Sequence, residues 1–225
     1  MTAVPQLFNY VDGISVHFYQ ANQNTPPENR IAGFQQVQRI IQPYIPNGKT
    51  VPVICSEWGV STLNAGAVNE TNQAWFDVRA WLTNIALGLP VSVCYAFNSL
   101  DQYNNPDGFG IVNNPSTGNY KPAFVALYTT TNILSGYFYE GTSSGYAQGD
   151  YVYKFYNPGS QTWILVVWTS GNAHYVNVAL SGNVYVKDYL GTQRTVSPNG
   201  ANSIPIYMNG GPQYIYVPYG ESVPN

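Results

Sequence analysis

The chain has 225 residues, of which 44% are hydrophobic and only 8% are charged. The hydrophobic share excludes intrinsic disorder, and the charged share is far below the roughly 25% of an average soluble protein. Eight Lys and Arg residues against eleven Asp and Glu residues give a net charge of −3, without a basic run, so we expect no nucleic-acid partner. No apolar stretch approaches the roughly 20 residues of a membrane span, so we expect no membrane partner.

The first 134 residues alternate between strand and helix patterns. The predicted strands are residues 11–18, 51–56 and 91–97, and the predicted helices are residues 28–42, 70–87 and 121–134. A long loop rich in Asn, Gly, Pro and Asp covers residues 98–119. This order is typical of a parallel sheet whose strands are joined by crossover helices.

Helical periodicity disappears after residue 135. Short strand patterns follow at residues 151–156, 163–168, 175–180, 184–189, 203–208 and 214–217, with turn signals between them. The pattern predicts an antiparallel β-sandwich. We therefore expect two domains, an α/β domain over residues 1–134 and an all-β domain over residues 135–225.

The polar surface is nearly uncharged and rich in aromatic rings, because the chain has 20 Tyr residues. Such a surface suits a neutral hydroxylated ligand such as a sugar, although secreted β proteins without a sugar role share this composition. Cys55 and Cys94 lie in separate apolar runs and are expected to be buried free thiols, with a disulfide between them as the alternative. Neither has a second Cys or a His at metal-ligand spacing, so we expect no metal site. Residues 1–6 show no signal peptide.

One carboxylate stands out as a catalytic candidate. Glu57 ends the buried strand that begins at Val51, and strict alternation would place it on one face with Val53 and Cys55. Active sites of α/β proteins are built where parallel strands end at their carboxyl termini. The alternative is a surface glutamate that opens a loop.

Aromatic and imidazole side chains end the two neighbouring strands. His17 and Tyr19 follow the first strand on a shared face and are expected to converge on Glu57. A Tyr hydroxyl that donates a hydrogen bond would keep the Glu57 carboxylate ionised. Tyr95 and Phe97 end the third strand and could form an aromatic wall. Packing in a core is the alternative for all four residues.

With these residues in place, the sequence resembles the C-terminal part of a clan A retaining glycoside hydrolase, a (β/α)8 TIM barrel followed by a β-sandwich. The run Val53-Ile-Cys-Ser-Glu57-Trp58-Gly59 is similar to the nucleophile motif of the seventh strand, and Val16-His17-Phe18-Tyr19 is similar to the end of the sixth. Phe109-Gly-Ile with Lys121-Pro-Ala-Phe resembles the segment after the eighth strand. Val186-Lys-Asp-Tyr-Leu-Gly191 resembles the accessory sandwich, so the likeness covers nearly the whole chain.

The resemblance implies roles for these residues. Glu57 would be the catalytic nucleophile, His17 and Tyr19 would line the site around a carbohydrate substrate, and Trp58 would be either a sugar platform or a buried side chain. The two-carboxylate mechanism needs no cofactor. We expect an extracellular or exported protein.

The sequence departs from the family pattern in two ways. Tyr95 and Phe97 stand where the family often ends its eighth strand with Trp. Only three barrel strands are present, and the acid/base Glu of the fourth strand is missing. Glu70 follows Asn69 as that acid would, but it begins a helix after the nucleophile, where the helix dipole explains it. Asp101 and Asp107 follow the third strand without any acid signature.

Three hypotheses explain why the chain would carry the nucleophile but not the acid/base residue. The chain is a fragment of a longer product, or half of an enzyme completed by another chain, or a homologue that catalyses nothing. A different function is a non-catalytic carbohydrate-binding or interaction module built on the Tyr-rich sandwich. Trp163, Trp168 and Tyr175 would be its platforms, unless they belong to the core.

Overall fold

The computed structural model describes residues 6–19, 24–63, 66–99, 101–102, 105–114, 119–200 and 202–224. The chain divides into two compact units. The first unit comprises Met1–Val68 and Arg79–Gly110, and the second comprises Asn69–Val78 and Ile111–Asn225. The helix α2 (Glu70–Ala86) therefore contributes residues to both units. The domain boundary expected between residues 134 and 135 stays a prediction.

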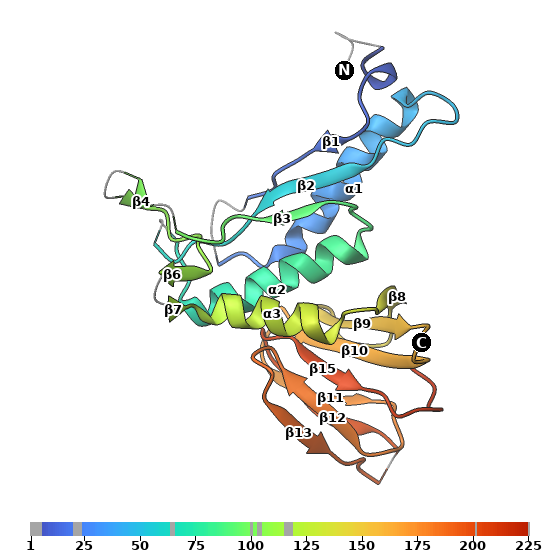
Figure 1. The fold of residues 1–225 in the computed structure, drawn as a ribbon. Coiled ribbons are helices and arrows are strands. Elements are labelled where there is room, and N and C mark those ends of the chain that lie inside the picture. Colours follow the sequence, from blue (N-terminus) through green and yellow to red (C-terminus); the bar gives the residue numbers. More distant parts are fainter. Residues whose placement is uncertain are drawn as a thin grey trace. The chain divides into compact units, whose positions relative to one another are not determined.

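The first unit is built on a parallel sheet of three strands. These are β1 (Ile14–Ser15), β2 (Val53–Trp58) and β3 (Ser92–Cys94), in the order β1-β2-β3. The pairings of β1 with β2 and of β2 with β3 are both parallel (Figure 1). The predicted parallel sheet is confirmed, and β1 is shorter than expected because only two of its residues pair with β2.

Helices connect these strands as the sequence periodicity predicts. A short 3₁₀ turn (Pro27–Arg30) leads into α1 (Ile31–Ile41), and a second one (Gln42–Tyr44) ends it at Pro43. The buried Phe34 of α1 packs edge-on against Phe18, with ring centroids 4.7 Å apart. This contact fixes α1 beside the segment that follows β1. A further 3₁₀ turn covers Leu7–Asn9.

A buried ion pair joins the 3₁₀ turn that precedes α1 to the helix α2. Arg79 donates from Nε and Nη2 to the two carboxylate oxygens of Glu28, at 2.7 and 2.6 Å. Both side chains are almost fully buried. Bidentate geometry of this kind is the arrangement in which a buried pair offsets its desolvation.

Breaking this pair should destabilise the first unit. Glu28→Gln leaves the Arg79 charge buried without its counter-ion, so we expect the free energy of unfolding to fall by about 3–5 kcal/mol in urea titrations. Asp12→Asn is the control, because the Asp12–Lys49 pair is exposed on the Asp12 side, and we expect a change below about 1 kcal/mol. Equal losses for the two variants would contradict the prediction.

Two antiparallel sheets form most of the second unit. The larger has the order β13-β12-β15-β10-β9-β8, and the smaller pairs β11 with β14 (Figure 1). The strands are β8 (Phe138–Thr142), β9 (Asp150–Asn157), β10 (Thr162–Thr169), β11 (His174–Val178), β12 (Val184–Asp188), β13 (Gln193–Val196), β14 (Ile204–Met208) and β15 (Gln213–Tyr216). Their inward side chains form one apolar core that includes Val167, Val186, Ile206 and Ile215. The antiparallel β architecture is confirmed, and β8 and β13 were not predicted.

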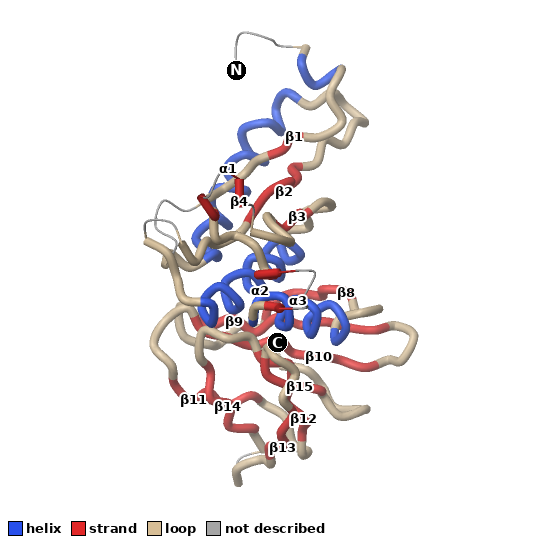
Figure 2. The backbone as a smooth tube through the Cα atoms, turned by 60° about the vertical axis from the view of Figure 1, so that its left-hand side comes forward, coloured by secondary structure: helices blue, strands red, loops and turns tan. Residues whose placement is uncertain are grey.

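Besides the first part of α2, a complete helix belongs to the second unit. It is α3 (Pro122–Ile133), and its buried Thr130 shares a hydroxyl–hydroxyl hydrogen bond with Tyr214 of β15. Tyr120, Phe124 and Tyr128 stack along the helix in parallel planes. Figure 2 shows α3 beside the strands of the large sheet.

The loop predicted over residues 98–119 contains two small hairpins. They pair β4 (Asp101–Gln102) with β5 (Asn105–Pro106) and β6 (Val112–Asn114) with β7 (Asn119–Tyr120). Among the described residues, no helix combines the length and the hydropathy needed to cross a bilayer.

A histidine–carboxylate contact links the two sheets of the second unit. His174 of β11 bonds through Nε2 to Asp150 of β9 at 3.1 Å, and its Nδ1 lies 2.9 Å from the Asn172 carbonyl oxygen. The Asn172 hydrogen bond and the Asp150 carboxylate raise the pKa of His174 above its ordinary value of 6.5. The contact therefore contributes most when His174 is protonated.

This contact should make stability depend on pH. Because the pKa is raised on folding, the contribution is complete below the unfolded-state pKa and is lost as pH rises through the folded-state pKa. We expect the stability difference between wild type and His174→Gln to be larger at about pH 5.5 than at about pH 8.5. The urea midpoints of both proteins at the two pH values measure this stability difference. A stability difference that grows with pH would contradict the proposed contribution of protonated His174.

Candidate functional site

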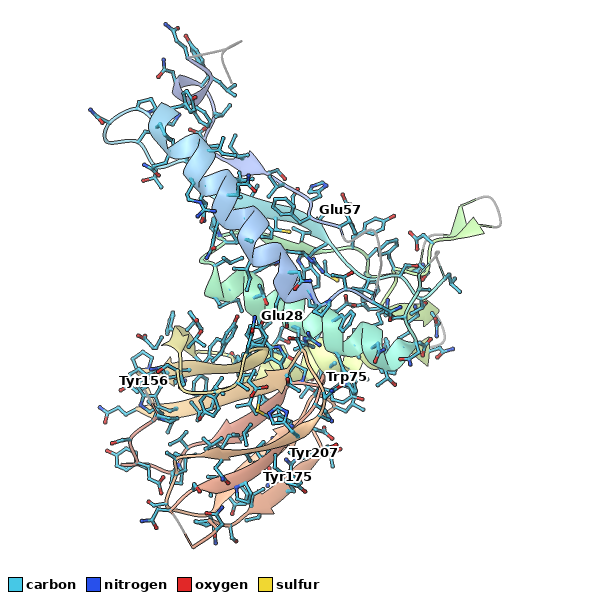
Figure 3. The ribbon with its side chains drawn as sticks, turned by 180° about the vertical axis from the view of Figure 1, so that it is seen from behind. Glu28, Glu57, Trp75, Tyr156, Tyr175 and Tyr207 are labelled. Carbon is cyan, nitrogen blue, oxygen red and sulfur yellow. The ribbon has the colours of Figure 1, made fainter. Side chains whose placement is uncertain are left out.

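The candidate site lies at the carboxyl ends of three neighbouring parallel strands in the first unit. Glu57 is near the end of β2, His17 and Tyr19 follow β1, and Tyr95 follows β3 directly. Parallel strands end at the same edge of their sheet, which brings these side chains together. Figure 3 labels Glu57 on β2, seen from behind the sheet.

An irregularity in β2 determines how Glu57 is presented. Cys55 pairs with Ser92 and Trp58 pairs with Cys94, so β2 carries one residue more than β3 between these pairs. Such a β-bulge interrupts the alternation of faces. Cys55 and Trp58 are both buried, whereas the Glu57 side chain is 33% exposed. The expectation that Glu57 shares the buried face of Val53 and Cys55 is therefore wrong, because the bulge turns Glu57 out of the core.

A chain of polar contacts holds the Glu57 carboxylate. His17 Nδ1 lies 2.9 Å from Glu57 Oε2, and His17 Nε2 lies 2.8 Å from the Ser56 hydroxyl. The Ser56 and Ser15 hydroxyls are 2.6 Å apart. With neutral His17, Nδ1–H donates to the carboxylate and Nε2 accepts from Ser56. The imidazole is thus oriented from both sides and still 41% exposed.

Tyr19 supplies a second donor to the same carboxylate. Burial, the Glu57 charge and a hydrogen bond to Glu57 together raise the pKa of Tyr19 far above its usual range. The phenol therefore stays protonated at any working pH and donates to the Glu57 carboxylate. The structure thus brings together Glu57, His17 and Tyr19.

Phe109 joins the aromatic side chains beside the site. Its ring packs edge-on against Tyr19 and Tyr95, with centroids 5.7 and 5.5 Å away. The Tyr95 hydroxyl donates to Asp107 Oδ2 at 2.9 Å, and the Phe109 amide donates to Asp107 Oδ1 at 3.1 Å. The hydrogen bond to Asp107 is the main cause that raises the pKa of Tyr95. Asp107 therefore organises this loop.

Two other predicted aromatic residues have opposite surroundings. Trp58 is buried, and its indole N–H donates to Ser92 at 2.9 Å. Its ring offers no face to a sugar, so the burial alternative holds for Trp58. Phe97 is 56% exposed and is available as part of an aromatic wall.

The aromatic residues predicted as sandwich platforms also differ. Trp168 is fully buried and stacks on Tyr151 at 5.0 Å, and Trp163 packs against the core. Tyr175 alone of the three is largely exposed, at 71%. The core interpretation therefore holds for Trp168, and Tyr175 stays available as a platform.

Sequence reasoning did not select Ser15, Ser56 or Phe109 as site residues. The two serines are short hydroxyl residues in strands, and only the pairing of β1 with β2 brings them together. Phe109 carries part of the family resemblance, but no local signal places its ring beside Tyr19. The side chain of Asp101 lies outside the described residues, and Glu70 begins α2 on the surface as expected. Within the described part of the chain, no group of three His, Cys, Asp or Glu side chains is arranged to hold a metal ion.

The glycine of the Glu57-Trp58-Gly59 run is required by packing. A Cβ on Gly59 would lie 1.9 Å from the Tyr95 carbonyl oxygen. A backbone hydrogen bond joins the ends of β2 and β3 here, because the Tyr95 amide donates to the Trp58 carbonyl at 2.6 Å. The ends of β2 and β3 can therefore approach only without a side chain at position 59.

Gly59→Ala should separate these strand ends. We expect a loss of about 1–3 kcal/mol or more in the free energy of unfolding, because the clash is with backbone that cannot rotate away. Urea unfolding measures it. Gly13→Ala is the control, since its Cβ would meet no atom closer than 3.5 Å. Stability of Gly59→Ala equal to that of Gly13→Ala would contradict the packing argument.

Comparison with known proteins gives a fold relationship. No protein-family model and no curated protein matches the chain. A family 39 glycoside hydrolase from the gut symbiont Bacteroides cellulosilyticus WH2 matches with a TM-score of 0.76 at 20% identity, over 94% of this chain and 45% of that one. A glucosidase from Croceicoccus marinus matches with a TM-score of 0.63 at 12% identity, over 92% of this chain and 53% of that one. An arabinofuranosidase matches with a TM-score of 0.63 at 12% identity, over 96% and 54%.

The matches cover nearly the whole chain, which spans about half the length of each of these three structures. At such identities they establish the fold. The expected resemblance in fold to glycoside hydrolases is confirmed.

Proposed function

We propose that this chain carries the nucleophile of a retaining glycoside hydrolase and forms the C-terminal strands of its (β/α)8 barrel together with the accessory sandwich. The observation that carries the proposal is an accessible carboxylate, Glu57, at the carboxyl end of a parallel strand, held by His17 and Tyr19. The fold shared with three glycosidases supports it.

In this proposal Glu57 reacts directly with the sugar. One carboxylate oxygen attacks the anomeric carbon while the bond to the leaving oxygen breaks, and that oxygen takes a proton from a second carboxylic acid about 5–5.5 Å away. Water then hydrolyses the glycosyl ester, and the second carboxylate accepts the proton of the water. His17 and Tyr19 orient the Glu57 carboxylate for this attack.

The second carboxylic acid is proposed to come from additional polypeptide. Asp107 does not fit the role, because Tyr95 and Phe109 occupy both of its oxygens. The sheet has open edges at β1 and β3, and Val91 and Val93 expose 41% and 47% of their surface. Open edges and exposed apolar residues favour pairing with further strands. We propose that five more barrel strands, in the same or another chain, close this sheet and carry the acid.

The nucleophile can be tested without the acid. Activated 2-fluoro glycosides with a dinitrophenolate leaving group need little acid assistance and trap the glycosyl-enzyme. Probes of glucosyl and arabinofuranosyl configuration are chosen because two of the structural neighbours are named for these sugars. We expect wild-type chain to gain the mass of one fluorosugar on a peptide that contains Glu57, and Glu57→Gln to gain none.

Glu70→Gln is the matched control, since Glu70 is an exposed glutamate that begins α2. We expect its labelling to equal that of wild type. Labelling that persists in Glu57→Gln would contradict the proposed role of Glu57.

A further inference from the structure

A cavity in the β-rich unit has a lining that includes none of the residues discussed for catalysis. We call it the sandwich pocket, and its volume is about 360 Å³. Its lining includes Asp188, Tyr189, Arg194, Tyr207, Asn209 and Gln213. Sites for small ligands begin at about 300 Å³, so the pocket has room for a small ligand.

The polar side chains of the sandwich pocket are fixed by hydrogen bonds. Gln213 at the start of β15 donates from Nε2 to the Tyr207 carbonyl at 2.8 Å, which links the large sheet to the small one. Arg194 of β13 donates from Nη2 to Gln213 Oε1. Asp188 Oδ1 accepts from the amides of Leu190 and Thr192, both at 2.9 Å. The polar groups are thus held in place before any ligand binds.

The aromatic wall of the pocket is rigid as well. Tyr189 packs edge-on against Trp75, with ring centroids 6.0 Å apart. A Cβ on Gly211 would lie 2.6 Å from Trp75 Nε1 and 3.0 Å from the Tyr189 ring, so the glycine lets the main chain lie directly on these rings.

The chemistry of the lining selects a class of ligand. One carboxylate, Asp188, and one guanidinium, Arg194, leave the pocket with no net charge. The hydrogen bonds above use both polar atoms of the Gln213 amide, one oxygen of Asp188 and one nitrogen of Arg194. Asp188 Oδ2 and the Nε and Nη1 groups of Arg194 take no part in them, so an acceptor and donors remain for the hydroxyls of a ligand. Tyr189 and Tyr207 add apolar ring surface that the C–H faces of a sugar ring can cover. We propose that the sandwich pocket binds a neutral saccharide, separately from the Glu57 site.

An exposed tyrosine pair extends the pocket. Tyr175 of β11 pairs across the small sheet with Tyr207 of β14, and the ring centroids are 5.0 Å apart (Figure 3). Tyr175 and Tyr207 are 71% and 45% exposed. Because this pair leads out of the pocket along the surface, the ligand is an oligosaccharide or a polysaccharide segment with one unit in the pocket.

Affinity electrophoresis of the full chain tests the proposal. The probes are a soluble β-glucan, an α-glucan and an arabinan as neutral polymers, and polygalacturonate as an anionic one, each in its own native gel. We expect at least one neutral polymer to retard the wild-type chain, and Tyr207→Ala and Arg194→Met each to weaken that retardation about tenfold in apparent affinity. Both side chains are exposed, and thermal melts check that both variants fold.

Two control variants show whether the retardation depends on the sandwich pocket. Tyr185→Ala removes an exposed tyrosine of the large sheet that does not line the pocket, and we expect wild-type retardation. Glu57→Gln should also bind like wild type, so failure of the nucleophile proposal and failure of this one are distinguishable. Retardation by no neutral polymer, retardation by polygalacturonate alone, or unchanged retardation of folded Tyr207→Ala and Arg194→Met would overturn the proposal.

Discussion

The extra residue of β2 between Cys55 and Trp58 is the constraint on which the candidate site depends. Regular pairing with β3 would keep the residues of β2 alternating between the helix-covered face and the open face. The bulge places Ser56 and Glu57 together between two buried residues, so both reach the same imidazole of His17. Burial of the Glu57 carboxylate in the core would cost free energy, because the charge would lose its hydration. The bulge leaves the carboxylate accessible, and it keeps its hydrogen bonds.

The parts around Glu57 work together because each fixes the next. Gly59 lets the ends of β2 and β3 approach, and Tyr95 at the end of β3 then anchors Asp107 and its loop. That loop brings Phe109 against Tyr19, which donates to Glu57. The proposed nucleophile and the aromatic side chains beside it therefore share one framework. The sandwich pocket has its own framework of hydrogen bonds, so the two proposed sites can be altered independently.

The sequence predicts the elements whose signal is local. The helices α1, α2 and α3 follow from apolar spacing with proline or glycine stops, and the meeting of Glu57, His17 and Tyr19 follows from the rule that parallel strands end at one edge. Features that depend on pairing were not predictable. The bulge arises from the register with β3, the burial of Trp58 follows from that bulge, and β8 and β13 were missed because Gly141 and a polar Gln-Arg-Thr run conceal their strand character.

The most direct test of the account is a crystal structure of the wild-type chain after reaction with an activated 2-fluoro glycoside. The account predicts continuous electron density from a Glu57 carboxylate oxygen to the anomeric carbon, with His17 still within hydrogen-bond distance of the carboxyl group. Density for the sugar joined to any other side chain, or a Glu57 side chain turned back into the core beside Cys55, would contradict it.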